Sequence, residues 1–126
     1  MEPIKNVNVL SLVGKGAGTF YSDQYANLHY KGIRLFGNVT DATNLTTLTI
    51  NLQIYDELSA TYIDMTGAVF VAWSGTGSKM MTIYPGLTAA ANTVVANHLG
   101  KKWRLKYIIV GTGAAINFTV NANYLG

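Results

Sequence analysis

Cysteine is missing from this sequence of 126 residues, which excludes structural disulfides, thiolate nucleophiles and cysteine-based metal sites. Charge is scarce as well, because Asp, Glu, Lys and Arg make up 12% of the chain, about half of the usual share in a soluble domain. Hydrophobic residues make up 49%, so part of the surface must be apolar or built from Asn, Thr, Ser and Gly. A large exposed apolar patch usually marks an interface.

Long apolar segments are also lacking. The longest wholly apolar run is residues 68–73, far short of the roughly 20 residues that cross a bilayer as a helix, so no membrane segment is expected. Residues 1–6 lack a cationic stretch followed by an apolar one, and we expect no cleaved secretory signal. The formal charge of +3 comes from mostly scattered lysines and does not by itself indicate nucleic acid as a partner.

Alternating apolar and polar residues predict antiparallel strands at residues 46–54 and 116–124. Residues 87–97 contain three alanines but also Asn, Thr and Val, so we expect a long loop or a single turn there. About eight strands predict an all-β fold, a single-domain antiparallel β-sandwich or jelly roll over residues 1–126, in which residues 1–25 could extend as an N-terminal arm. The other predicted strands, rich in β-branched and aromatic residues, are 6–13, 33–39, 61–65, 68–73, 79–84 and 103–110.

Patterns typical of catalysis are weak. His29 and His98 lie far apart in the sequence and in no recognisable motif, and the six acidic residues show no metal-loop spacing. The glycines of residues 14–18 are not followed by the helix start that a dinucleotide loop needs, and residues 75–79 have the residues of a P-loop in the wrong order. The sequence predicts no catalytic residue, no cofactor and no metal; an enzyme would need a bound metal or a strongly perturbed histidine.

Basic residues gather on one predicted strand. Lys102, Arg104 and Lys106 share one face of it, and Trp103 lies on the opposite face. The simpler interpretation is a solvated strand face opposite a core tryptophan. The alternative is a positive stripe for an acidic partner surface, although four basic groups, Lys101 included, fall short of the footprint of a nucleic-acid-binding domain.

Several short motifs run from residue 30 to residue 125. They are Tyr30-Lys31-Gly32-Ile33, Thr47-Leu48-Thr49-Ile50, the stretch 83–94 with its Tyr84-Pro85-Gly86, Leu99, Trp103-Arg104, Phe118-Thr119-Val120 and residues 122–125. In these motifs the chain resembles a family of small virion structural proteins of tailed bacteriophages. The Tyr-Pro-Gly followed by Trp-Arg is the most specific part, and the first thirty residues match less well.

The resemblance implies a head-associated structural role, commonly that of a decoration protein bound to the major capsid protein on the outside of the shell. Such a protein would be made in the host cytoplasm and carried in the virion. Decoration at local three-fold positions implies a homotrimer. The expected partner contacts come from the N-terminal arm, the loop 87–97 and the basic strand face: Tyr21, Tyr25, Leu87, Thr88, Asn92, Lys102, Arg104 and Lys106.

Two other non-enzymatic interpretations remain open. A head-tail connector or tail protein would share the fold but occur in few copies per particle. A carbohydrate-binding host-attachment module would stack aromatic rings on sugars, and its candidate residues are Tyr21, Tyr25, Tyr30 and Trp73.

Overall fold

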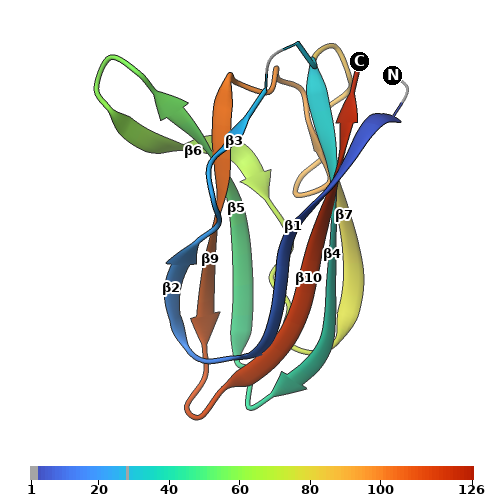
Figure 1. The fold of residues 1–126 in the computed structure, drawn as a ribbon. Helices are drawn as coiled ribbons and strands as arrows, with labels where there is room; N and C mark the ends of the chain where they lie inside the picture. Colours follow the sequence, from blue (N-terminus) through green and yellow to red (C-terminus); the bar gives the residue numbers. More distant parts are fainter. Residues whose placement is uncertain (1–2, 28) are drawn as a thin grey trace.

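The structure is a computed structural model that describes residues 3–27 and 29–126. Within these residues ten strands form two packed sheets, and no helix is present that could cross a membrane (Figure 1). The predicted all-β sandwich is confirmed. The strands are β1 (Pro3–Lys15), β2 (Gly18–Tyr21), β3 (Tyr25–Ala26), β4 (Gly32–Thr43), β5 (Thr47–Asp56), β6 (Thr61–Val69), β7 (Gly77–Ile83), β8 (Val94–Val95), β9 (Lys102–Val110) and β10 (Ala115–Leu125).

The two sheets mix strands from both halves of the chain. One sheet has the order β1-β10-β4-β7-β8, and the other has the order β2-β9-β5-β6, with β3 paired to β9. All pairs are antiparallel except β7 with β8. The first and last strands are neighbours, since β1 pairs along β10 and β10 pairs on its other side with β4.

The core lies between the sheets and is built by side-chain alternation, which places every second residue of a strand on the same face. Strands β9 and β10 show this clearly, because buried and partly exposed residues alternate along both. Trp103 is fully buried, as its face assignment predicted, and its indole Nε1 donates a hydrogen bond of 3.1 Å to the hydroxyl of Tyr124. The described residues contain no buried side-chain nitrogen or oxygen without a partner.

The structure departs from the predicted strands in the segment 61–73. Residues 61–65 and 68–73 were expected as two strands, but residues 61–69 form the single strand β6. Residues 70–72 are not strand, although the backbone of Phe70 still donates a hydrogen bond of 3.1 Å to Ile50. The backbone of Trp73 then exchanges hydrogen bonds of 2.8 and 2.9 Å with Leu48. Of the run 68–73, predicted as one strand, only residues 68–69 are strand; Ala68, Phe70 and Trp73 are buried, whereas Val71 and Ala72 are exposed.

The N-terminal segment does not form an arm where the structure describes it. Residues 3–15 are β1, paired along β10, and residues 18–21 are β2, paired with β9. Apolar residues of this segment, such as Val9 and Leu10, join the core, and that burial favours the sheet over a free arm. Residues 1–2 lie outside the described residues.

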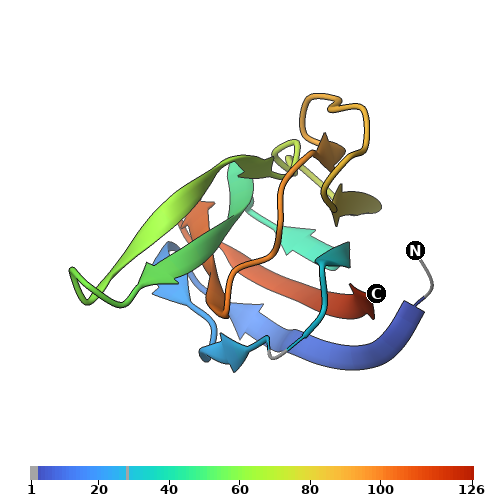
Figure 2. The same cartoon turned by 90° about the horizontal axis from the view of Figure 1, so that it is seen from above.

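A hairpin made of β5 and β6 reaches beyond the body of the sandwich (Figures 1 and 2). Its paired residues run from Gln53 opposite Asp64 to Asp56 opposite Thr61. The register then shifts, because only Leu52 separates Gln53 from Asn51 on β5, while four residues separate their partners Asp64 and Val69 on β6. Such a bulge bends and twists the bulged strand, which accounts for the outward course of the hairpin.

Candidate partner-binding surface

The outer face of the sheet β2-β9-β5-β6 collects tyrosines and basic groups. Strand register places Tyr21 beside Lys106 and Arg104 beside Gln53. Gln53 is in turn opposite Asp64, and Tyr55 is opposite Tyr62. We call this surface the tyrosine–arginine face and define it by Tyr21, Gln53, Tyr55, Tyr62, Asp64, Lys102, Arg104 and Lys106.

Arg104 lies at the centre of the tyrosine–arginine face. Its guanidinium carbon is 4.0 Å from the ring centroid of Tyr21 and 3.7 Å from that of Tyr62, so the cation is held between two aromatic rings. Its Nε donates a hydrogen bond of 2.8 Å to Oε1 of Gln53. The amide of Gln53 donates a further bond of 2.8 Å to Oδ1 of Asp64. The arginine is therefore fixed in position before any partner arrives.

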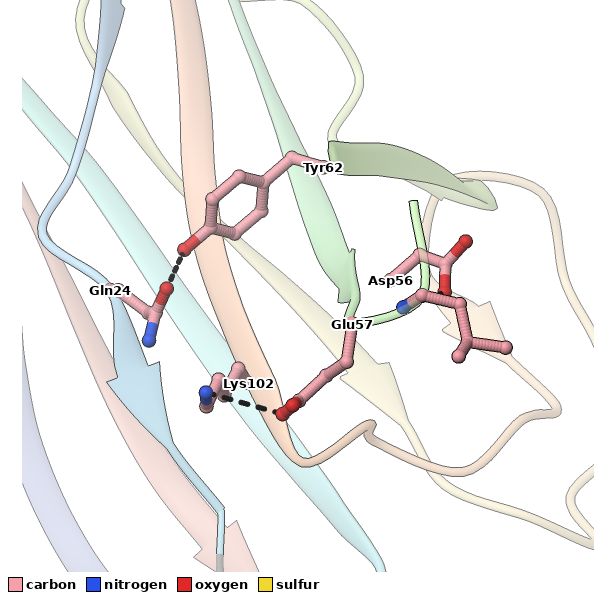
Figure 3. A network of polar contacts seen from close by, with 6 residues as sticks. Gln24, Asp56, Glu57, Tyr62 and Lys102 are labelled. Carbon is pink, nitrogen blue, oxygen red and sulfur yellow. Dashed lines mark hydrogen bonds and ion pairs between the residues drawn. The ribbon is translucent and has the colours of Figure 1, made fainter. Parts of the chain in front are cut away.

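Polar contacts join the hairpin to the body of the protein (Figure 3). Nζ of Lys102 on β9 forms an ion pair of 3.2 Å with Oε1 of Glu57 at the hairpin tip. The hydroxyl of Tyr62 donates a hydrogen bond to the side-chain oxygen of Gln24, which lies between β2 and β3. The rings of Tyr55 and Tyr62 pack with centroids 5.0 Å apart. Three separate segments of the chain thus meet at this surface.

The chemistry of this surface suits binding better than catalysis. Tyrosine and arginine are the residues most enriched at the energetic centres of protein interfaces, because they bury a large area around a polar group. Tyr21 keeps 48% of its surface exposed and can still be covered by a partner. Within residues 3–27 and 29–126, no group of three or more histidine or acidic side chains is placed to hold a metal ion.

The predicted contact residues do not all lie at this surface. Tyr21, Lys102, Arg104 and Lys106 are brought together there by β2 and β9. Tyr25 instead stacks on the buried Trp103 with ring centroids 5.0 Å apart, and its hydroxyl donates a bond of 3.2 Å to the carbonyl of Val9. Burial is the main cause of its raised pKa, and the negative charge of Asp23 adds to it.

The predicted contacts of the loop 87–97 lie in the connection between β7 and β8, two strands of the other sheet. Leu87 is half-buried and Thr88 is exposed, in the stretch between β7 and β8. Asn92 has a φ of 61°, in the left-handed region that asparagine tolerates better than most residues. Its Nδ2 donates a bond of 2.9 Å to the carbonyl of Val69, and so it anchors the loop to β6.

The set of aromatic residues suggested for stacking on sugars is not assembled. Trp73 is only 2% exposed and packs on Phe70 with ring centroids 5.2 Å apart, so it was wrongly placed at the surface. Tyr30 packs on Tyr124 with centroids 4.9 Å apart. Residue spacing alone did not reveal these contacts, because they form between strands far apart in the sequence.

Sequence reasoning also missed part of the tyrosine–arginine face. Gln53 lies on the polar face of the predicted strand 46–54, where alternation was the available signal, and Tyr55 lies one residue beyond the predicted end, in the part of β5 that was missed. Tyr62 and Asp64 join them only through the register of the hairpin. No local pattern in residues 61–65 identified that register.

Comparison with known proteins gives a fold and no family. No family model matches the chain, and no curated protein matches it. One solved chain of similar structure is from the cryo-EM atomic structure of Broad Bean Stain Virus; it is 12% identical with a TM-score of 0.52, and the alignment covers 98% of this chain and 87% of that one. The shared feature at this identity is the fold alone.

A second solved structure is more distant in shape. It is the CBM36-1 domain of a multidomain xylanase from the hindgut metagenome of Trinervitermes trinervoides, 13% identical with a TM-score of 0.42, and the alignment covers 97% of this chain and 98% of that one. We draw no argument from this similarity.

Proposed function

We propose that this protein is a non-enzymatic structural protein of a tailed-bacteriophage virion, and that it decorates the outside of the capsid by binding the major capsid protein. The observation that supports the proposal most directly is the position of Arg104. It belongs to the Trp103-Arg104 motif, part of the most specific resemblance to the phage family, and it lies between Tyr21 and Tyr62 on the tyrosine–arginine face.

The two residues of this motif have different roles in the fold. Trp103 points into the core and stabilises the sandwich, while Arg104, the next residue, points to the outer face of the same strand. A capsid partner that covered Arg104 and Tyr21 would bury an aromatic and cationic surface that is already ordered. Because a preformed surface loses little conformational entropy on binding, it favours association.

In a decoration protein each single contact with the capsid can be of modest affinity. An interface of standard size buries about 800 Å² per partner. When a protein bridges neighbouring capsid subunits, its second contact is intramolecular and gains from a high effective concentration. A sandwich of 13.6 kDa with one modest binding face is therefore large enough for the task.

The test is the copy number of this chain relative to the major capsid protein in purified particles, measured by quantitative mass spectrometry. A decoration protein should be present in hundreds of copies per particle, on the order of the capsid subunits themselves. A count near six or twelve, about the number at a neck or tail, would support the head-tail connector or tail interpretation. Absence from particles would contradict every virion role.

A binding experiment tests the face itself. Expanded capsids lacking this protein should bind the wild-type chain, and Arg104→Ala should reduce binding by about tenfold or more, as loss of an interface centre does. The matched control is Thr19→Ala, an exposed residue of β2 in the same sheet. Equal binding by Arg104→Ala and the wild type would move the contact away from the tyrosine–arginine face.

A further inference from the structure

The tip of the β5–β6 hairpin exposes apolar side chains that its own chain does not cover. Leu58 is 100% exposed, and Ile63 is 55% exposed. Beside them an open groove is lined by Ile54, Ile63 and Met65 of the hairpin and by His98 of the neighbouring loop. The hairpin projects on one side of the sandwich in both views (Figures 1 and 2). Since Ile54 pairs with Ile63 and Tyr55 with Tyr62, alternation places the two isoleucines on the hairpin face opposite the two tyrosines of the tyrosine–arginine face.

This exposed tip is held in place. Glu57 pairs with Lys102 of β9 at 3.2 Å, and Tyr62 lies against the guanidinium of Arg104. Within the turn, the carboxylate of Asp56 accepts hydrogen bonds from the backbone of Leu58 at 3.1 Å and from the hydroxyl of Ser59 at 2.7 Å. A fixed hairpin presents its tip at a lower entropic cost than a mobile one.

Charge is divided unevenly between the hairpin and the rest of the chain. Residues 54–64 contain Asp56, Glu57 and Asp64 and no lysine or arginine, which gives them a formal charge of −3. Since the whole chain carries +3, the remaining residues together carry +6. The hairpin is thus complementary in charge to the body of another copy of the same protein.

We propose that the β5–β6 hairpin is a docking arm that binds the basic body of a second copy of this chain, head to tail, with Leu58 as its apolar anchor. A two-fold contact between two hairpins would set three acidic groups against the same three, and like charges repel. A head-to-tail contact joins two different surfaces, the hairpin of one copy and the body of the next, so successive copies can join in the same direction and close into a ring.

The self-association is independent of the capsid role. It is measured on the isolated protein, whereas the capsid role is measured on particles, so either can fail without the other. Only the expectation of three copies per ring rests on the proposed function, because it comes from local three-fold positions on a shell.

The experiment is sedimentation velocity on the wild type, Leu58→Ser and Val13→Ser over a range of protein and salt concentrations. Val13 is the matched control, since it is an apolar residue on β1 that is 84% exposed. The wild type and Val13→Ser should self-associate equally. Added salt should weaken the self-association of both, because salt screens exposed charges. Leu58→Ser should raise the dissociation constant by about tenfold or more with an unchanged melting temperature.

Three results would overturn the docking arm: a monomeric wild type at every concentration, association of Leu58→Ser equal to the wild type, or the same loss in Val13→Ser. A monomer that still binds capsids through Leu58 would assign the hairpin to the capsid instead of a second copy.

The direction of the contact has its own test. Because the chain has no cysteine, Leu58→Cys provides a single thiol, and a disulfide requires the two Cα atoms to come within about 7 Å. In a head-to-tail contact the tips do not meet, and mild oxidation should give no more disulfide dimer than the same variant in denaturant. Rapid dimer formation in the folded variant would show a two-fold contact and contradict the proposal.

Discussion

Two neighbouring residues, Trp103 and Arg104, show how a strand separates stability from recognition. The indole is enclosed by Tyr25, which stacks on it at 5.0 Å, and by Tyr124, which accepts its hydrogen bond. The Arg104 side chain on the opposite face contacts Tyr21, Tyr62 and Gln53. Substitutions at the two positions should therefore have separable effects.

Replacing Trp103 tests the first of these roles. Trp103→Ala should lower the free energy of unfolding by about 3–5 kcal/mol, because it leaves a cavity and removes the partner of Tyr124. Chemical denaturation followed by circular dichroism measures the change. Thr19→Ala, on the exposed face of β2, is the control and should melt like the wild type. A Trp103→Ala variant of near-normal stability would show that the indole is not in the core.

The contact between β4 and Trp73 predicts a sensitive glycine. A Cβ atom at Gly37 would lie 2.6 Å from Cη2 of Trp73, whose ring is enclosed in the core. Gly37→Ala should therefore destabilise the protein by about 1–3 kcal/mol through overpacking. At Gly75 an added Cβ meets nothing within 4 Å, so Gly75→Ala is the matched control for the same denaturation series. Equal denaturation midpoints for Gly37→Ala and Gly75→Ala would contradict the close packing of Gly37 against Trp73.

At the scale of elements, the hairpin depends on side chains of the body for its orientation. Among the described strands, β5 alone pairs with β6 through its backbone, so the outer part of the hairpin is oriented by Tyr62 against Arg104 and by Glu57 against Lys102. These contacts are partly exposed and individually weak. Loss of one of these contacts should therefore loosen the hairpin without loosening the rest of the sandwich.

Hydrogen exchange can measure that loosening. Arg104→Ala should speed amide exchange in residues 54–63 by about fivefold or more, as the loss of an interaction of about 1 kcal/mol implies, while exchange in β10 should stay slow. Lys106→Ala removes a basic group from the same strand face but not the contact with Tyr62, and it should leave hairpin exchange unchanged. Equal exchange in the two variants would show that Arg104 does not hold the hairpin.

Elements with a regular pattern could be predicted from sequence. Residues 46–54 and 116–124 alternate between apolar and polar side chains, and β5 and β10 cover them almost entirely, with the apolar side in the core. Strands of two to four residues, such as β2 and β8, are too short to show a period. They form because a longer strand beside them, β9 or β7, offers backbone partners.

The candidate site was predictable only in part, for a related reason. Alternation placed Lys102, Arg104 and Lys106 on one face, but it could not say which strands lie beside β9. Tyr62 reaches Arg104 from β6, across the intervening β5, and Trp73 is buried through its bridge to Leu48. Those neighbours follow from sheet order, which depends on contacts between distant segments.

The stability of the whole molecule should depend on alkaline pH, because several of its tyrosines lie in the core or pack against it. Burial is the largest cause of the raised pKa values of Tyr25, Tyr107 and Tyr124, above the ordinary value of 10.0. Below that value the phenols are neutral in both the folded and the unfolded chain, and their contribution to stability is intact. Above it the unfolded chain ionises first, so unfolding becomes more favourable as pH rises.

Urea denaturation between about pH 8 and pH 11 should show this loss. The free energy of unfolding should fall with a slope that steepens near the ordinary tyrosine pKa. The slope should be smaller in Tyr107→Phe, which keeps the buried ring and removes the phenol. A stability that is constant across this range would mean that these hydroxyls ionise as easily in the folded state as in the unfolded one.

The position of β10 between β1 and β4 also governs when this protein can fold during its synthesis. A ribosome releases β1 and β4 first, yet both must wait for residues 115–125 before either gains its common neighbour. Until then the nascent chain carries unpaired strand edges and uncovered apolar faces, the features that attract chaperones and promote aggregation. A prematurely terminated copy would lack the strand that joins β1 to β4 and would be a target for proteolysis instead of a partner for assembly.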